Sequence, residues 1–179
     1  MGVLKRFSVA DLIIISAIAA LGIAVKPIVG PISKFISTPL GIPGGSLAGG
    51  FYMMWLVLAV CIVNKKYTGT VFGILQAVLV LLVGMSGKQG AFSLVSYPLP
   101  GIMADVLFHF LRHRQKLFTH LVLGMASNVT GSLVTAVIFF HLPAMMVGVN
   151  FALATASGIM GGYLSYGSYM ALHKARIVK

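Results

Sequence analysis

The chain has 179 residues, of which 59% are hydrophobic and only 8% are charged, and its formal net charge is +11. Soluble domains carry about 25% charged residues, so the 13 basic and 2 acidic side chains are too few to cover a globule of this size. This composition excludes an ordinary water-soluble domain and predicts an integral membrane protein. The single cysteine excludes a disulfide framework and a cysteine-rich metal site.

Apolar segments recur along the whole chain. A membrane helix needs about 20 apolar residues, so six crossings leave room only for short connections. The six predicted spans are residues 9–25, 46–63, 68–85, 99–111, 118–140 and 148–172. Lys26-Pro27 follows the first span without a small-residue cleavage site, which favours a membrane helix over a signal peptide. The sequence therefore predicts an all-α integral membrane protein, a bundle of six transmembrane helices that forms one domain over residues 1–179.

Basic residues fall unevenly on the connections between these spans. Three of them, Lys26, Lys34 and Lys88, lie in one alternating set of connections. The other ten lie in the second set and at the chain ends: Lys5, Arg6, Lys65, Lys66, Arg112, Arg114, Lys116, Lys174, Arg176 and Lys179. Cytoplasmic loops carry an excess of Lys and Arg, so we expect both termini to be cytoplasmic. This clustering also accounts for the positive charge without a nucleic-acid partner.

The two outer connections, residues 26–45 and 86–98, are apolar but rich in helix-breaking residues. PIVGPISKFISTPLGIPGG, residues 27–45, contains four prolines and four glycines, and KQGAFSLVSYPLP follows at residues 88–100. We expect neither segment to form a regular helix. Because lipid cannot satisfy an irregular backbone, the two segments are predicted to cover or line a cavity. A plain connector at the membrane surface is the alternative.

Patterns typical of catalysis and metal binding are scarce. Asp11 and Asp105 are the only acidic residues, and we expect Asp105 to be an internally hydrogen-bonded carboxylate near the inner interface. The sequence has no His-Glu-x-x-His helix, no phosphate-binding glycine loop and no Gly-x-Ser-x-Gly turn. Most of the five histidines are expected at the membrane interface. We therefore predict no enzyme activity, no metal site, no cofactor and no ATPase site.

Small residues recur at every fourth position of several predicted helices. Ser16, Ala20 and Ala24 form such a stripe on the first helix. Ala154, Gly158 and Gly162 form another on the sixth helix, and Ser127, Gly131 and Thr135 a third on the fifth. Stripes of this kind let helix backbones approach closely in lipid. Packing inside the bundle is the favoured explanation for the fifth and sixth helices, and docking of a partner subunit is favoured for the first.

Polar and aromatic side chains in the outer half of the bundle are the candidates for a ligand site. Polar groups inside a membrane are costly and tend to be functional, and aromatic rings suit a flat ligand. The predicted substrate-binding residues are Tyr52, Trp55, Gln76, Lys88, Gln89, Tyr97, Asn128 and Asn150.

These features together resemble the S components of energy-coupling factor (ECF) transporters. The resemblance rests on six spans, cytoplasmic termini, the stripe on the first helix, the proline-rich outer segment and the missing ATPase motif. It implies that the chain captures a vitamin or metal ion, associates with a transmembrane T subunit and two cytoplasmic ATPase subunits, and topples in the bilayer to release its ligand.

Two sequence stretches are similar to the YkoE-type, thiamine-related branch of that family. They are LAGGFYMMW at residues 47–55 and GIMADVLFHFLRHR at residues 101–114. The resemblance implies thiamine or a thiamine precursor as the ligand, although neutral Gln76 stands where a carboxylate is expected for thiamine. We therefore expect a vitamin-capturing S component in a prokaryotic plasma membrane. An S component for a different vitamin and a non-transport membrane assembly protein are the alternatives, and a nickel or cobalt S component is disfavoured because an N-terminal metal-binding histidine is missing.

Overall fold

The structure, a computed structural model, describes residues 7–40, 44–111, 113 and 115–177, and it contains helices and no strand over those residues. The helices in chain order are α1 (Val9–Ala24), α2 (Lys26–Ser37), η2 (Thr38–Leu40), α3 (Gly45–Val63), α4 (Thr68–Leu82), η3 (Gly87–Phe92), α5 (Ser93–Ser96), α6 (Pro98–Leu111), α7 (Leu117–Val134), the π-helical η4 (Thr135–Phe139) and α8 (Ala144–Lys174). The prediction of an all-α protein is confirmed.

Several of these helices are long and apolar enough to cross a bilayer. Four meet the requirement within the described residues: Ser46–Val63, Gln89–Leu111, Leu117–Phe139 and Ala144–Lys174. α1 and α2 form a fifth candidate span that is bent by 45°, whereas α4 is a shorter apolar helix of 15 residues. The chain is therefore a multi-pass membrane protein. The count of six crossings and the cytoplasmic location of the termini stay predictions.

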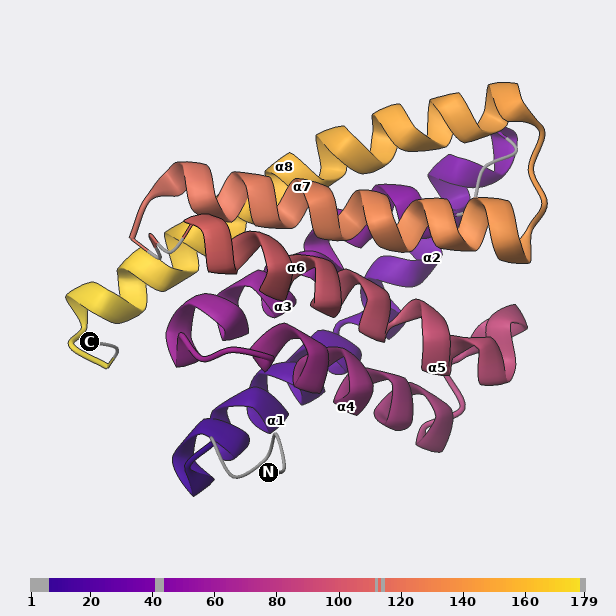
Figure 1. Cartoon of the computed structure of the whole chain (residues 1–179). Helices are drawn as coiled ribbons and strands as arrows, with labels where there is room; N and C mark the ends of the chain where they lie inside the picture. The colour runs from indigo at the N-terminus through magenta and orange to yellow at the C-terminus, as the bar shows by residue number, and fades with distance from the viewer. Residues whose placement is uncertain (1–6, 41–43, 112, 114, 178–179) are drawn as a thin grey trace.

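The helices alternate in direction between two ends of the bundle (Figure 1). The start of α1, the end of α3, the start of α7 and the end of α8 lie at one end, toward the left of the view. α2, α5 and the connection from α7 to α8 lie at the opposite end. Lys65, Lys66, Lys116, Lys174 and Arg176 follow or precede the helix ends of the first group. Most of the described basic residues thus gather at one end of the molecule, and Lys26 and Lys34 of α2 lie at the other.

α3 is the central helix of the bundle. It packs against α1, α2, α4, α6, α7 and α8, and its residues Leu56–Cys61 are almost completely buried. The exposed side chains of the outer helices are largely apolar, as for Leu82 and Phe110, which are 78% and 77% exposed. An apolar surface around a packed interior is the arrangement that a bilayer requires.

The backbones of α3 and α8 touch at a pair of glycines. A Cβ atom on Gly161 would lie 1.9 Å from the carbonyl oxygen of Gly50. Beside this contact, the Ser157 hydroxyl accepts a hydrogen bond from the Gly50 N–H at 2.9 Å and donates one to the Leu47 carbonyl oxygen at 2.5 Å. Because helices in lipid lack a hydrophobic drive to associate, close backbone packing and such bonds hold this interface.

The two carboxylates of the chain both stabilise helix ends. Asp11 forms a capping box with Ser8 at the start of α1 and is ion-paired with Lys65. Asp105, on α6, accepts hydrogen bonds from the N–H groups of Gly69 and Thr70, each at 2.8 Å, and from the Thr70 hydroxyl. Asp105 therefore caps the N-terminus of α4 from a neighbouring helix, where the helix dipole favours a negative charge. The prediction of an internally hydrogen-bonded Asp105 is confirmed.

The first outer segment, residues 26–45, departs from the sequence prediction. The expectation of an irregular backbone is wrong for Lys26–Ser37, because these residues form α2. Pro27 lies in the first turn, where no intrahelical N–H bond is lost, and Pro31 removes only one bond. The second outer segment, residues 86–98, is broken as expected: η3 contains Gly90 at φ 50°, ψ −128°, and α5 has only four residues.

His120 also departs from its predicted place at the membrane interface. Its ring is fully buried between α7 and α8, with Nδ1 3.0 Å from the Ser165 hydroxyl oxygen. Sequence position alone suggested an interfacial residue because His120 lies close to the basic cluster, whereas its helix turns it into the interior.

Candidate functional site

A cavity of about 470 Å³ lies at the end of the bundle that contains α2 and α5. Its walls come from α2, α3, α4, the η3–α5 segment, α7 with η4 and the beginning of α8. A volume of this size is typical of pockets for small organic molecules. Both outer segments of the sequence, residues 26–45 and 86–98, therefore contribute to the walls.

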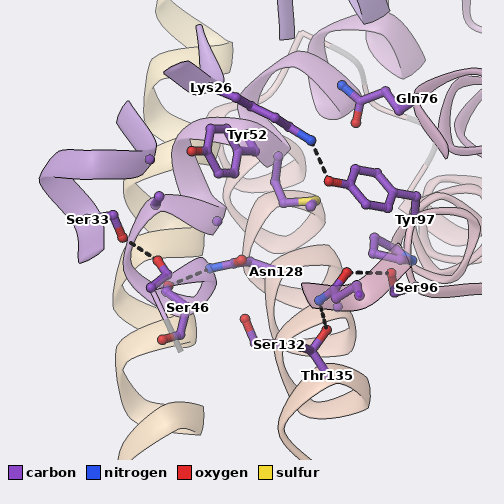
Figure 2. A pocket seen from close by; sticks show the side chains of 18 of the residues that line it. Lys26, Ser33, Ser46, Tyr52, Gln76, Ser96, Tyr97, Asn128, Ser132 and Thr135 are labelled. Atoms are coloured by element: carbon purple, nitrogen blue, oxygen red, sulfur yellow. Dashed lines mark hydrogen bonds between the residues drawn. The ribbon is translucent and has the colours of Figure 1, made fainter. Parts of the chain in front are cut away.

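Lys26 and two tyrosines form the most polar wall of this cavity. Figure 2 shows the Lys26 side chain reaching from the start of α2 to the hydroxyl of Tyr97. Nζ donates a hydrogen bond to that hydroxyl at 2.5 Å and lies 4.3 Å from the centre of the Tyr97 ring and 5.5 Å from that of Tyr52. These distances fit cation–π contacts, which stabilise the ammonium group without neutralising it.

Hydroxyl and amide groups line another part of the wall. The Ser96 hydroxyl donates to Gln89 Oε1 at 3.2 Å, and Gln89 Nε2 donates to the Thr135 hydroxyl at 3.4 Å (Figure 2). This chain of bonds joins η3 and α5 to η4, so it fixes the broken outer segment against the end of α7. Ser132, one turn earlier on α7, also lines the cavity.

α2 covers the cavity with one face and exposes the other. Gly30, Ser33 and Lys34 line the cavity, and the Ser33 hydroxyl donates to the carbonyl oxygen of Gly44. On the far side, Phe35 is 85% exposed. The alternation of small polar and large apolar residues therefore makes α2 an amphipathic cover for the pocket.

Two buried polar atoms of the cavity wall have no hydrogen-bond partner among the described residues. They are Nε2 of Gln76 and Oδ1 of Asn150, on side chains that are 5% and 0% exposed. Leaving such groups unpaired is costly, and both atoms belong to residues that line the cavity.

The cavity brings together most of the predicted binding residues. Tyr52, Gln76, Gln89, Tyr97, Asn128 and Asn150 all line it. Trp55 does not line the cavity, because its side chain packs against Gly22 on α1. The prediction for Lys88 falls on a side chain outside the described part of the structure. The Asn128 amide donates to the backbone carbonyl of Ala154 at 2.8 Å, so this residue also joins α7 to α8.

Several wall residues, above all Lys26, were not predicted from the sequence. The sequence places Lys26 in an outer connection, and the bend between α1 and α2 turns the side chain inward. Ser96 and Ser132 were missed because hydroxyl groups are common in membrane helices and carry no spacing signal, and Thr135 was interpreted only as part of a packing stripe.

The charge of the cavity wall is positive. Lys26 and Lys34 are its charged residues, and the described wall contains no carboxylate, imidazole or thiol. Nor do the described residues contain any group of three or more His, Cys, Asp and Glu side chains that could hold a metal ion. The wall thus offers ammonium, amide and hydroxyl groups together with aromatic rings.

The stripe on α1 lies away from this cavity. Ser16, Ala20 and Ala24 are all exposed on the surface of the described structure. Their role in docking a partner subunit stays a prediction.

One family of known proteins matches this chain. The family model described as "ABC-type cobalt transport system, permease component" matches residues 10–134, which include α1 to α7. The chain belongs to this family. No curated protein and no solved structure matches the chain in the corresponding comparisons.

Membership of this permease-component family agrees with the apolar helices described above. The protein is a membrane component of an ABC-type transport system, and such a component works with partner subunits. The match ends at Val134, so α8, which supplies Asn150 to the cavity, lies outside the matched residues.

Proposed function

We propose that this protein is the substrate-capture (S) component of an ECF-type ABC importer and binds a small vitamin-like molecule in the cavity beneath α2. The observation that carries the proposal is the cavity of about 470 Å³, which combines two tyrosine rings with a buried Gln76 and Asn150 whose polar atoms lack partners. Such a wall suits a flat molecule with several hydrogen-bonding groups.

An organic ligand fits this wall better than a bare cobalt ion. Divalent cobalt is held by imidazole, carboxylate or thiolate groups, and the described wall supplies none of them. Two lysines would also repel a metal cation. The word cobalt in the family description therefore does not carry over to the ligand that we propose for this chain.

Within the vitamin-like class, we favour a thiamine precursor over thiamine itself. Thiamine carries a permanently cationic thiazolium ring, which would lie in a cavity with two ammonium groups and no carboxylate among its described residues. The uncharged pyrimidine half of thiamine, or its phosphate ester, avoids this repulsion. The tyrosine rings and the amide of Gln76 supply stacking and hydrogen bonding for such a ring.

The cavity end of the bundle is proposed to face outward in a prokaryotic plasma membrane. The described basic residues at the ends of α3 and α8 gather at the opposite end, and positive charge favours the cytoplasmic side. A transmembrane T subunit and two cytoplasmic ATPase subunits would supply the energy, and the protein itself would have no enzyme activity. The exposed Ser16, Ala20 and Ala24 would dock the T subunit.

The test is direct identification and measurement of the ligand. Mass spectrometry of the detergent-solubilised protein should find a co-purified small molecule, and calorimetry should show that the pyrimidine precursor or its phosphate ester binds more tightly than thiamine and that CoCl₂ does not bind. Tyr52→Ala removes a ring from the cavity wall and should weaken binding about tenfold, which corresponds to roughly 1–1.5 kcal/mol.

A matched control for this variant is Tyr163→Ala on α8. Tyr163 is 62% exposed and does not line the cavity, so its removal should leave binding unchanged. Specific binding of cobalt alone, or equal loss of binding in the two tyrosine variants, would contradict the proposed function.

A further inference from the structure

Lys26 stands out in the cavity because its charge has no acidic counterpart. The sequence contains only two acidic residues. Asp11 is ion-paired with Lys65, and Asp105 accepts three hydrogen bonds at the N-terminus of α4. Both therefore serve the opposite end of the bundle, so no carboxylate among the described residues pairs with Lys26.

The partners that Lys26 does have carry no negative charge. The Tyr97 hydroxyl accepts a hydrogen bond from Nζ, and the rings of Tyr97 and Tyr52 lie within cation–π distance. An ammonium group has three donors, so at least one stays available to the cavity. The Tyr97 hydroxyl, which accepts from Lys26, still has its own proton to donate.

These two groups therefore present donors side by side. Nζ and the Tyr97 hydroxyl oxygen are 2.5 Å apart, and both belong to residues that line the cavity (Figure 2). A carboxylate or phosphate has two or more acceptor oxygens and can accept from both groups at once. A charged acceptor also makes a stronger hydrogen bond than a neutral one.

We propose that Lys26 and Tyr97 form a subsite for an acidic oxygen group, a carboxylate or a phosphate, of the captured molecule, and that Lys26 determines the charge specificity of the pocket. This inference rests on the proposed function because it assigns the substrate class of the same cavity. Among thiamine precursors it selects the phosphate ester over the free alcohol. Cationic molecules are disfavoured because no carboxylate of the described wall can pair with them.

The cavity contains a matched control for Lys26. Lys34 also lines it, from the middle of α2, but makes neither an aromatic contact nor a side-chain hydrogen bond in the described structure. Lys26→Met and Lys34→Met remove the same charge from the same cavity. Lys26→Arg keeps a positive charge at residue 26. It therefore keeps the proposal testable if Lys26→Met fails to fold.

The experiment measures pairs of probes that differ only in the acidic group. The pairs are the pyrimidine precursor and its monophosphate, nicotinamide and nicotinate, and pantothenol and pantothenate, each titrated into wild-type protein and the three variants in detergent. In the wild type, the acidic member of any pair that binds should bind at least about tenfold more tightly, as a charge-assisted hydrogen bond predicts. The preference should disappear in Lys26→Met, persist in Lys26→Arg and fall much less in Lys34→Met than in Lys26→Met.

The failures of the two proposals are distinguishable. Wild-type protein that binds the neutral members as well as the acidic ones would overturn the charge-selecting role of Lys26 and leave the proposed function intact. Equal loss of the preference in Lys26→Met and Lys34→Met would overturn it as well. Absence of binding by every organic probe would overturn both proposals. Loss of the preference in phosphatidylglycerol nanodiscs would assign the subsite to a lipid headgroup and overturn the assignment to the captured molecule.

Discussion

The small-residue stripes on α1 and α8 have the same spacing but opposite surroundings. Ala154, Gly158 and Gly162 of α8 are buried, and a Cβ atom on Gly162 would lie 2.3 Å from the carbonyl oxygen of His120 on α7. On α1, Ser16, Ala20 and Ala24 are all exposed. The α8 stripe is already occupied by α7, whereas the α1 stripe faces out of the molecule.

The difference shows that a stripe of small residues predicts close helix contact but not the partner. In α8 the contact lies within the chain, as favoured from the sequence. In α1 the helix buries a different face, which includes Ile15, Ala19 and Gly22, so the stripe is left for contact with lipid or another subunit. Three variants test how tightly the two helices pack, from the largest expected effect on folding to the smallest.

The largest effect is expected for Gly161→Ala, on the α8 face that packs against α3. The new methyl group would lie 1.9 Å from the carbonyl oxygen of Gly50, and a backbone atom cannot move aside as a side chain does. We expect a loss of several kcal/mol, enough to abolish a monodisperse peak in detergent size-exclusion chromatography. Gly167→Ala, on the same helix with nothing within 4 Å, is the control and should be neutral or slightly stabilising. If Gly161→Ala and Gly167→Ala gave the same chromatography peak, the tight backbone contact between α3 and α8 would be contradicted.

An intermediate effect is expected for Gly22→Ala, on the buried face of α1. Its methyl group would lie 2.6 Å from Nε2 of Gln76, the end of a side chain that can shift. We expect a cost of about 1 kcal/mol in thermal unfolding and weaker ligand binding, because Gln76 lines the cavity. Gly30→Ala, where the nearest atom is the Tyr52 hydroxyl at 3.8 Å, should leave the melting temperature unchanged or raised. A fully stable Gly22→Ala protein with normal binding would show that Gln76 has no fixed role.

The smallest effect on folding is expected for Ala20→Leu combined with Ala24→Leu. Both positions are exposed, so the added side chains meet no atom of this chain's core, and the change in stability should stay within about 0.5 kcal/mol. If the stripe docks the T subunit, co-purification with the transporter complex should be lost while ligand binding is retained. Unchanged co-purification would contradict the docking role of α1.

The candidate site was predicted from the sequence only in part. Tyr52, Gln76 and Asn150 were found because polar and aromatic groups are rare enough in membrane helices to be conspicuous. Lys26 was missed because its contact with Tyr97 joins residues 71 positions apart. The helix α2 was missed because its prolines were counted as breakers, although both lie where few backbone bonds are lost.

Composition and hydropathy alone determined that this is an all-α membrane protein with alternating helices, because the bilayer restricts a spanning chain to a few arrangements. The sequence also has only two acidic residues that could pair with a buried cation. Only the tertiary structure decided which stripe is buried, which helix each carboxylate caps, and that Lys26 contacts two tyrosines in the wall of a cavity. Those outcomes depend on helix rotation and on the bend between α1 and α2, which are set by packing between residues far apart in sequence.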